Sequence, residues 1–288
     1  MWCDRRRRIG PRAQAHGDSA GGGRVIDGLM TALGAPNLPW VAGASVLAGL
    51  VYGFAGFGAA LIFMPLTTVF ISAPVAIAAF SVSALASLIT VVPGAWKVAD
   101  RRAVAVMIGG CLICAPLGVA ILRLAPDPVI RAVIAALTLG TLAVLIAGWR
   151  VPARGGWPVR AGVGALSGIT GGATGLNGPP VILFNLATDQ PVAVTRGNLA
   201  VFLTLTSLGV LPQLWLQGML RPQAVWLGLI LLIPYSAGTW CGVRLFNPRH
   251  AVLYRCLAYG LIGAAGLAAL PGVGPGETRT AAGSHAIE

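Results

Sequence analysis

Two related glycine-rich segments occur in this chain about 119 residues apart, and each lies within a long apolar stretch. The first reads AGLVYGFAGFGAALIFMPL over residues 48–66, and the second reads SGITGGATGLNGPPVILFNL over residues 167–186. In register, three glycines of the first copy coincide with three of the second: Gly49, Gly53 and Gly56 with Gly168, Gly172 and Gly175. A duplicated apolar unit with a glycine-broken helix in each copy is typical of a membrane transporter with a site between its halves.

The composition indicates a membrane protein. The chain is 56% hydrophobic and 10% charged, with a mean hydropathy of +0.82, whereas a soluble domain has about 25% charged residues. The net charge of +12 raises the question of nucleic-acid binding. That reading is excluded because the basic residues are in a tail and in short connections, and they form no solvated basic face.

Eight apolar stretches are long enough to cross a bilayer, which needs about 20 residues. They span 41–70, 74–96, 103–122, 128–149, 159–187, 190–216, 222–241 and 250–270. We therefore predict an all-α integral membrane protein with about eight transmembrane helices in two four-helix repeats, each with a glycine-broken first helix. Four crossings per repeat predict parallel repeats. If a glycine segment enters and leaves the membrane on one side, the repeats are inverted instead.

The predicted domains are a first transmembrane repeat at 37–149, a central loop at 150–157 and a second repeat at 158–271. Disordered tails are expected at 1–36, which is basic, and at 272–288, because neither can bury enough apolar surface to fold alone. An alternative is that the protein starts at Met30. We expect a multi-pass protein of the cell (inner) membrane, and the distribution of Lys and Arg favours cytoplasmic termini.

The glycine segments predict helices that stop, bend and restart. Glycine allows backbone conformations closed to other residues, and the run Asn177-Gly178-Pro179-Pro180 combines it with residues that suit a helix start. A restarting helix presents free N–H groups and a partial positive charge, which suit an anion. The alternative is that the glycines let helices pack closely. Gly49 with Gly53, and Gly168 with Gly172, fit that alternative through their GxxxG spacing.

Candidate substrate-binding residues are the glycines of both breaks and the few polar side chains near them. They are Gly56, Gly58, Thr174, Gly175, Asn177, Gly178, Arg196 and Asn198. For Arg196 two readings stay open: an intramembrane charge at the site, or a side chain that extends to the headgroups. The pair Cys111 and Cys114 lies within an apolar helix without a nearby His, so we expect it to pack. No residue set for catalysis or metal binding is recognised.

On the motifs YGFAGFGAALIFMPL and SGITGGATGLNGPPVILF, and on the four-plus-four duplication, the chain resembles the TauE/SafE family of membrane anion transporters, also called sulfite exporters. The resemblance covers roughly residues 40 to 270. It implies an all-helical bundle without cofactors that moves sulfur-containing oxyanions or organosulfur anions such as sulfite and sulfoacetate. The family's motif residues in this chain are Gly53, Gly56, Gly58, Pro65, Gly172, Gly175, Asn177, Gly178 and Pro179.

The sequence thus predicts a secondary transporter of small, sulfur-containing anions, and not an enzyme. Its expected partners are the anionic substrate and the lipid bilayer, with a coupling ion and a homo-oligomer as open possibilities. Two alternatives remain at this point. One is a passive anion channel built on the same site, and the other is a non-transporting membrane assembly protein.

Overall fold

The computed structural model describes residues 37–148, 156–188, 190–245 and 251–270. These residues form helices without any strand. Six helical segments within them are long and apolar enough to cross a membrane. The predicted all-α membrane fold is therefore confirmed. The two predicted tails, and the central loop up to residue 155, lie outside the described residues.

The first repeat comprises seven helices: α2 (Leu38–Ala55), α3 (Ala59–Thr67), α4 (Ala73–Ser83), α5 (Leu85–Thr90), α6 (Val92–Val98), α7 (Arg101–Leu124) and α8 (Asp127–Ala147). The second comprises five: α9 (Trp157–Thr174), α10 (Gly178–Ala187), α11 (Val192–Leu216), α12 (Pro222–Leu245) and α13 (Ala251–Ala268). Seven of these helices carry proline at one of their first two positions. Proline fits there because those N–H groups have no partner within the helix.

Glycines in the left-handed region end the first helix of each repeat. Gly56 has φ +78° and its N–H bonds to the carbonyl of Tyr52 at 2.8 Å. Gly175 has φ +74° and its N–H bonds to the carbonyl of Gly171, also at 2.8 Å. Glycine adopts this conformation without the steric cost that a side chain imposes. The predicted helix breaks are therefore confirmed in both copies.

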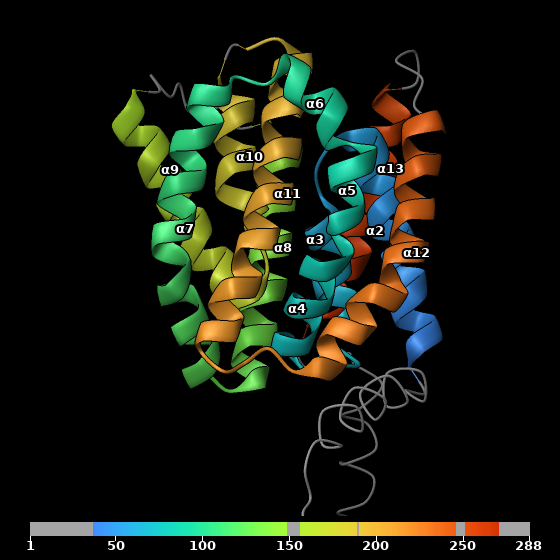
Figure 1. Cartoon of the computed structure of the whole chain (residues 1–288). Coiled ribbons are helices and arrows are strands. Elements are labelled where there is room, and N and C mark those ends of the chain that lie inside the picture. The colour runs from blue at the N-terminus through green and yellow to red at the C-terminus, as the bar shows by residue number, and fades with distance from the viewer. Residues whose placement is uncertain (1–36, 149–155, 189, 246–250, 271–288) are drawn as a thin grey trace, which may run out of the picture.

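Each break turns the chain back toward the membrane side from which it came. In the first repeat, Trp40 at the start of α2 stacks on Phe70, which follows α3, with ring centroids 6.5 Å apart. Figure 1 shows α2 starting at the bottom of the bundle and α9 starting at the top. The repeats are thus inverted. The expectation of parallel repeats was wrong, because each glycine segment forms a hairpin and the number of passes per repeat becomes odd.

The first helix of each repeat packs along a helix of the other repeat. α2 lies beside α12, and α9 lies beside α7 (Figure 1). A Cβ on Gly53 would be 2.8 Å from the amide nitrogen of Val243, and one on Gly172 would be 2.8 Å from that of Val119. These approaches are too close for any side chain, so the GxxxG glycines serve helix packing. Cys111 is buried at the same α7–α9 contact, where Gly168 meets its backbone.

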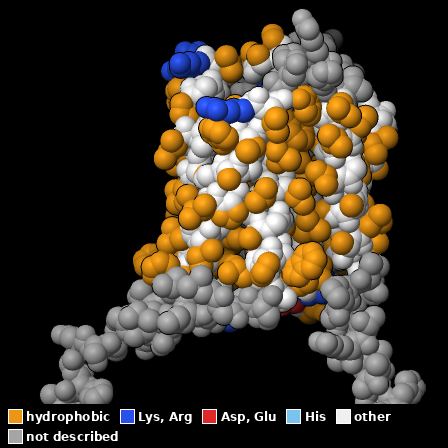
Figure 2. All heavy atoms as spheres, turned by 90° about the vertical axis from the view of Figure 1, so that its right-hand side faces the viewer, with side chains coloured by type: hydrophobic (Ala, Val, Ile, Leu, Met, Phe, Trp, Pro, Cys, Tyr) orange, Lys and Arg blue, Asp and Glu red, His pale blue; other side chains and the backbone are white. Residues whose placement is uncertain are grey.

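The outside of the bundle is apolar. Large hydrophobic side chains such as Ile89, Ile113 and Ile233 are more than 70% exposed. Figure 2 shows one such face, covered with hydrophobic side chains along its height and with Lys and Arg near its ends. This is the surface expected of a bundle immersed in lipid.

Candidate functional site

The two glycine breaks meet at a buried cavity between the repeats. The cavity has a volume of about 30 Å³, and since a water needs about 10–15 Å³ of such space, it has room for about two waters. The first break contributes Gly58 and the start of α3, and the second contributes Asn177, Gly178 and Pro179. The polar side chains around it are those of Tyr52, Ser87, Asn177, Thr204, Ser207 and Tyr235. Three of the predicted site residues, Gly58, Asn177 and Gly178, therefore lie on one cavity.

The α9–α10 turn is held by hydrogen bonds of its own side chains. The amide of Asn177 donates to the hydroxyl of Thr206 at 2.6 Å, and its contact with the hydroxyl of Ser207 is 3.4 Å. The hydroxyl of Thr174 donates to the carbonyl of Thr170 at 2.7 Å and accepts the N–H of Leu176 at 3.2 Å. Thr174 thus stabilises the turn, and it lines neither this cavity nor the smaller one next to it.

A second, smaller cavity adjoins the first on the side of the α9–α10 turn. It is lined by Gly175 and Asn177 together with Met64 from α3 and Ile77 from α4. A Cβ on Gly175 would be 2.7 Å from the methyl carbon of Met64. The predicted residue Gly175 therefore sits where the second break touches the first repeat.

The two helix starts at the main cavity differ in the N–H donors that they offer. In α3, Ala59, Ala60 and Leu61 line the cavity and each carries an N–H. In α10, Gly178 carries one, but the next two residues, Pro179 and Pro180, carry none. No side chain caps either start. The first break therefore offers the cavity more N–H donors than the second.

Two buried tyrosines complete the cavity, and the sequence did not single them out. The hydroxyl of Tyr52 donates to the carbonyl of Ala200 at 3.1 Å and lies 2.9 Å from the hydroxyl of Thr204. The hydroxyl of Tyr235 accepts from Ser87 at 3.5 Å. Tyr52 belongs to the first glycine motif, and the whole chain has four tyrosines. A buried Tyr in a glycine motif was the signal that could have found it.

Arg196 lies at the first break but does not line either cavity. Its guanidinium donates to the carbonyl of Phe54 at 2.9 Å, in the last turn of α2. A Cβ on Gly56 would be 3.5 Å from its Nε. Arg196 thus holds the end of α2 from the second repeat, and Gly56 makes room for it. The two readings from the sequence, a charge at the site and a side chain that extends to the headgroups, stay predictions.

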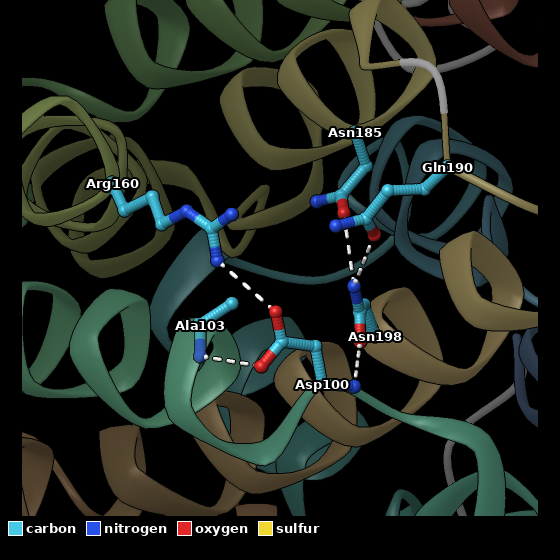
Figure 3. A network of polar contacts seen from close by, with 6 residues as sticks. All are labelled: Asp100, Ala103, Arg160, Asn185, Gln190 and Asn198. Carbon is cyan, nitrogen blue, oxygen red and sulfur yellow. Dashed lines mark hydrogen bonds and ion pairs between the residues drawn. The ribbon is translucent and has the colours of Figure 1, made fainter. Parts of the chain in front are cut away.

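Asn198 belongs to a polar cluster with Asp100 and Arg160 (Figure 3), and it lines neither cavity. Its side-chain oxygen accepts the N–H of Asp100 at 2.8 Å, and its amide donates to Gln190 at 3.1 Å. Asp100 caps α7 through the N–H of Ala103 at 3.1 Å and pairs with Arg160 at 3.3 Å. The bond from Ala103 and the weaker effect of Arg160 lower the pKa of Asp100. The cluster ties the starts of α7, α9 and α11 together.

Inverted repeats with a site between broken helices are found in many membrane transporters. Residues 41–269 match the family model described as Sulfite exporter TauE/SafE. The chain belongs to this family of membrane transporters, which are not enzymes. No curated protein and no solved structure matches the chain.

Proposed function

We propose that this protein is a secondary transporter of small anions, namely sulfur-containing oxyanions or organosulfonates of the sulfite and sulfoacetate type. The observation that carries the proposal is the buried cavity where the two inverted glycine hairpins meet. Its polar lining combines the start of α3 with hydroxyl and amide side chains that can donate and accept hydrogen bonds. The family supports an anion exporter in general terms.

The groups proposed to hold the anion are backbone N–H groups and neutral side chains. The N–H groups of Ala59, Ala60, Leu61 and Gly178 lie at helix starts on the cavity. They would replace the water of the anion, and the positive end of the α3 dipole would favour its charge. Of the predicted residues, Gly58, Asn177 and Gly178 would contact the anion. Gly56, Thr174, Gly175, Arg196 and Asn198 would support the two breaks and their surroundings.

Alternating access follows from the inverted arrangement. Each first helix is packed on the other repeat, so that α2 with α12 and α7 with α9 form two units on either side of the cavity. Rocking of one unit against the other would expose the site to each membrane face in turn. The described residues that line the cavity include no acid. Coupling would then come from the membrane potential or from a proton carried by the anion.

Flux in proteoliposomes tests this function. Purified protein is reconstituted and given sulfite, thiosulfate or a sulfonate under an anion gradient or a membrane potential. We expect saturable flux that can be driven uphill. Asn177→Ala should raise the half-saturating concentration about ten-fold, because it removes the bonds that fix the α9–α10 turn. Ile113→Ala, which changes a lipid-facing side chain, is the matched control.

The same measurements separate the alternatives. Flux that never saturates and only runs downhill would indicate a passive channel. Absence of flux for every anion and gradient, with correctly folded protein, would favour a non-transporting assembly protein. A concentration series of the detergent-solubilised protein would reveal a homo-oligomer.

Orientation in the cell (inner) membrane is a separate part of the proposal. Both described ends of the chain lie on one side of the bundle (Figure 1). That side has Arg123, Arg131 and Arg221 near its helix ends, and the opposite side has Lys97, Arg101, Arg102, Arg160, Arg196 and Arg244. The arginines of residues 1–36 weigh against this difference. Cytoplasmic termini therefore stay a prediction, and labelling of a cysteine placed between α6 and α7 decides it.

A further inference from the structure

The smaller cavity beside the α9–α10 turn has the size of one water molecule or one small ion. Its volume is about 10 Å³, and a single water needs about 10–15 Å³ of such space. Its polar side chains are those of Ser81 from α4, Asn177 from the turn and Ser207 from α11. Asn177 and Ser207 also line the main cavity. An ion in the smaller cavity would therefore lie next to the proposed anion.

Two side chains that line the smaller cavity have an oxygen without a hydrogen-bond partner among the described residues. Ser81 is 2% exposed, and its hydroxyl makes no hydrogen bond to any of them. The hydroxyl of Thr206 donates to the carbonyl of Phe202 at 2.7 Å, so it accepts from the amide nitrogen of Asn177 at 2.6 Å. This bond fixes the orientation of the amide and leaves the Oδ1 of Asn177 without a donor. Buried oxygens of this kind cost free energy unless an occupant of the cavity satisfies them.

The carboxyl-terminal end of α9 adds backbone carbonyls and a partial negative charge. Gly171 in its last turn and Gly175 at its C-cap line the smaller cavity. The carbonyls of Gly175 and Leu176 have no N–H four residues further along the chain, because those residues are Pro179 and Pro180. The end of a helix carries roughly half a negative charge. The smaller cavity therefore favours a cation over a neutral molecule.

The corresponding helix end in the first repeat already has a cation beside it. Arg196 donates to the carbonyl of Phe54 in the last turn of α2, and it is the last residue of the segment PVAVTR. The corresponding segment of the first repeat reads PVAIAA and has Ala79 in place of the arginine. The described residues that line the smaller cavity include no Lys or Arg. The end of α9 thus has a water-sized cavity beside it, whereas the end of α2 has a guanidinium.

The oxygens around the smaller cavity suit an alkali cation. They belong to hydroxyls, one amide and backbone carbonyls, and no carboxylate is found among the described residues that line it. Calcium and magnesium are bound with the help of carboxylates. No group of three or more His, Cys, Asp or Glu side chains within the described part of the chain could hold a metal ion. Broken transporter helices bind sodium through unwound carbonyls and helix C-terminal ends, and potassium is larger than sodium.

We propose that the smaller cavity binds one sodium ion, held by Ser81, Asn177, Ser207 and the carbonyls at the end of α9. The ion has the same role at the second break that Arg196 has at the first. It lies beside the anion and attracts it, so each ion raises the affinity for the other by the same factor. A sodium gradient thereby joins the membrane potential and the anion's own proton as a source of coupling. The coupling rests on the proposed function, whereas the sodium site does not.

Thermal unfolding of the purified, detergent-solubilised protein tests the site without any transport. Sodium chloride is compared with potassium chloride and choline chloride at equal concentrations, so that chloride and ionic strength stay constant. We expect sodium alone to raise the unfolding temperature, with an effect that saturates. Sulfite added as its potassium salt should lower the sodium concentration that gives half of this effect.

Ser81→Ala removes one proposed ligand of the ion and leaves the lining of the main cavity unchanged. The sodium concentration that gives half of the stabilisation should rise at least about ten-fold. Ser83→Ala is the matched control, because Ser83 is also buried in α4 but bonds to the carbonyl of Phe80 and lines neither cavity. It should leave that concentration unchanged.

Two results would overturn the sodium site. One is stabilisation by potassium or choline as strong as that by sodium, and the other is a sodium response that Ser81→Ala leaves unchanged. Sodium binding by a protein that moves no anion in proteoliposomes would support the site and refute the proposed function. Anion flux that is equal in sodium and choline buffers would overturn the coupling, even where the unfolding temperature reports the ion.

Discussion

The α2–α3 turn and the α9–α10 turn come from one duplicated motif but offer different chemistry to the cavity. The α2–α3 turn presents three consecutive residues with N–H groups, and Arg196 of the other repeat lies against it. The α9–α10 turn presents one N–H followed by two prolines, and it is locked by Asn177 onto α11. We take the first turn as the electrostatic part of the site and the second as its rigid wall. A motif that looks more specialised in sequence can thus be the one with fewer donors.

The largest expected difference between the turns is in stability. Gly175→Ala forces a side chain into the left-handed region and within 2.7 Å of Met64, whereas Gly58→Ala meets no atom closer than 3.5 Å. We expect Gly175→Ala to cost about 3 kcal/mol and Gly58→Ala about 1 kcal/mol. Thermal unfolding of the purified proteins measures both. Equal losses would show that the second turn is not more tightly packed than the first.

The next largest effect is expected on anion binding, when the α2–α3 turn loses one N–H donor. Ala60 is the second residue of α3, the position that Pro179 has in α10. Ala60→Pro removes one N–H from the cavity, at a position in the first helical turn where proline is tolerated. Binding of methanesulfonate should weaken roughly 10- to 100-fold, since a hydrogen bond to a charged group is worth about 1.5–3 kcal/mol. Unchanged binding by folded protein would remove the first turn from the site.

A smaller effect is expected at the two tyrosines. Tyr52 lies on α2 next to the first break, and Tyr235 lies on α12 with its hydroxyl bonded to Ser87. Tyr52→Phe should weaken anion binding about five-fold, because it removes the hydrogen bonds that hold α2 against α11 beside the cavity, and one neutral hydrogen bond contributes about 1 kcal/mol. Tyr235→Phe is the isosteric comparison and should have a weaker effect. A larger loss at Tyr235 would move the anion toward α12 and away from the first turn.

The smallest predicted effect is a tightening of anion binding. Pro179→Ala restores an N–H to the second turn at the cavity wall. Anion binding should tighten two- to three-fold at most. Without the ring of Pro179 the start of α10 is less rigid, and ordering it on binding costs roughly 0.5 kcal/mol, which offsets part of the gain. Isothermal titration measures it, with Ala60→Pro as the reciprocal variant. A loss of binding on Pro179→Ala would mean that rigidity of this turn outweighs its donors.

Local features of the fold followed from the sequence with good accuracy. The stretch predicted at 103–122 is α7 at Arg101–Leu124, and the one predicted at 222–241 is α12 at Pro222–Leu245. Both helix breaks fall at the glycines that predicted them. These features depend on apolar length and on backbone conformations that glycine and proline decide within a few residues.

Contacts between distant residues could not be predicted in the same way. The hydroxyl of Tyr52 meets Thr204, 152 residues away, and Arg196 meets Phe54, 142 residues away. Asn198 was expected near the anion but bonds to Asp100. Hydropathy and spacing carry no information on which helix faces which.

The sequence by itself determined that this chain is a duplicated, all-helical membrane protein of the TauE/SafE family with a glycine break in each half. Only the tertiary structure decided that the repeats are inverted and that both breaks open onto one uncharged cavity. The physical reason is that a break is a local property of the backbone, whereas its direction and its surroundings depend on how helices from both repeats pack around it.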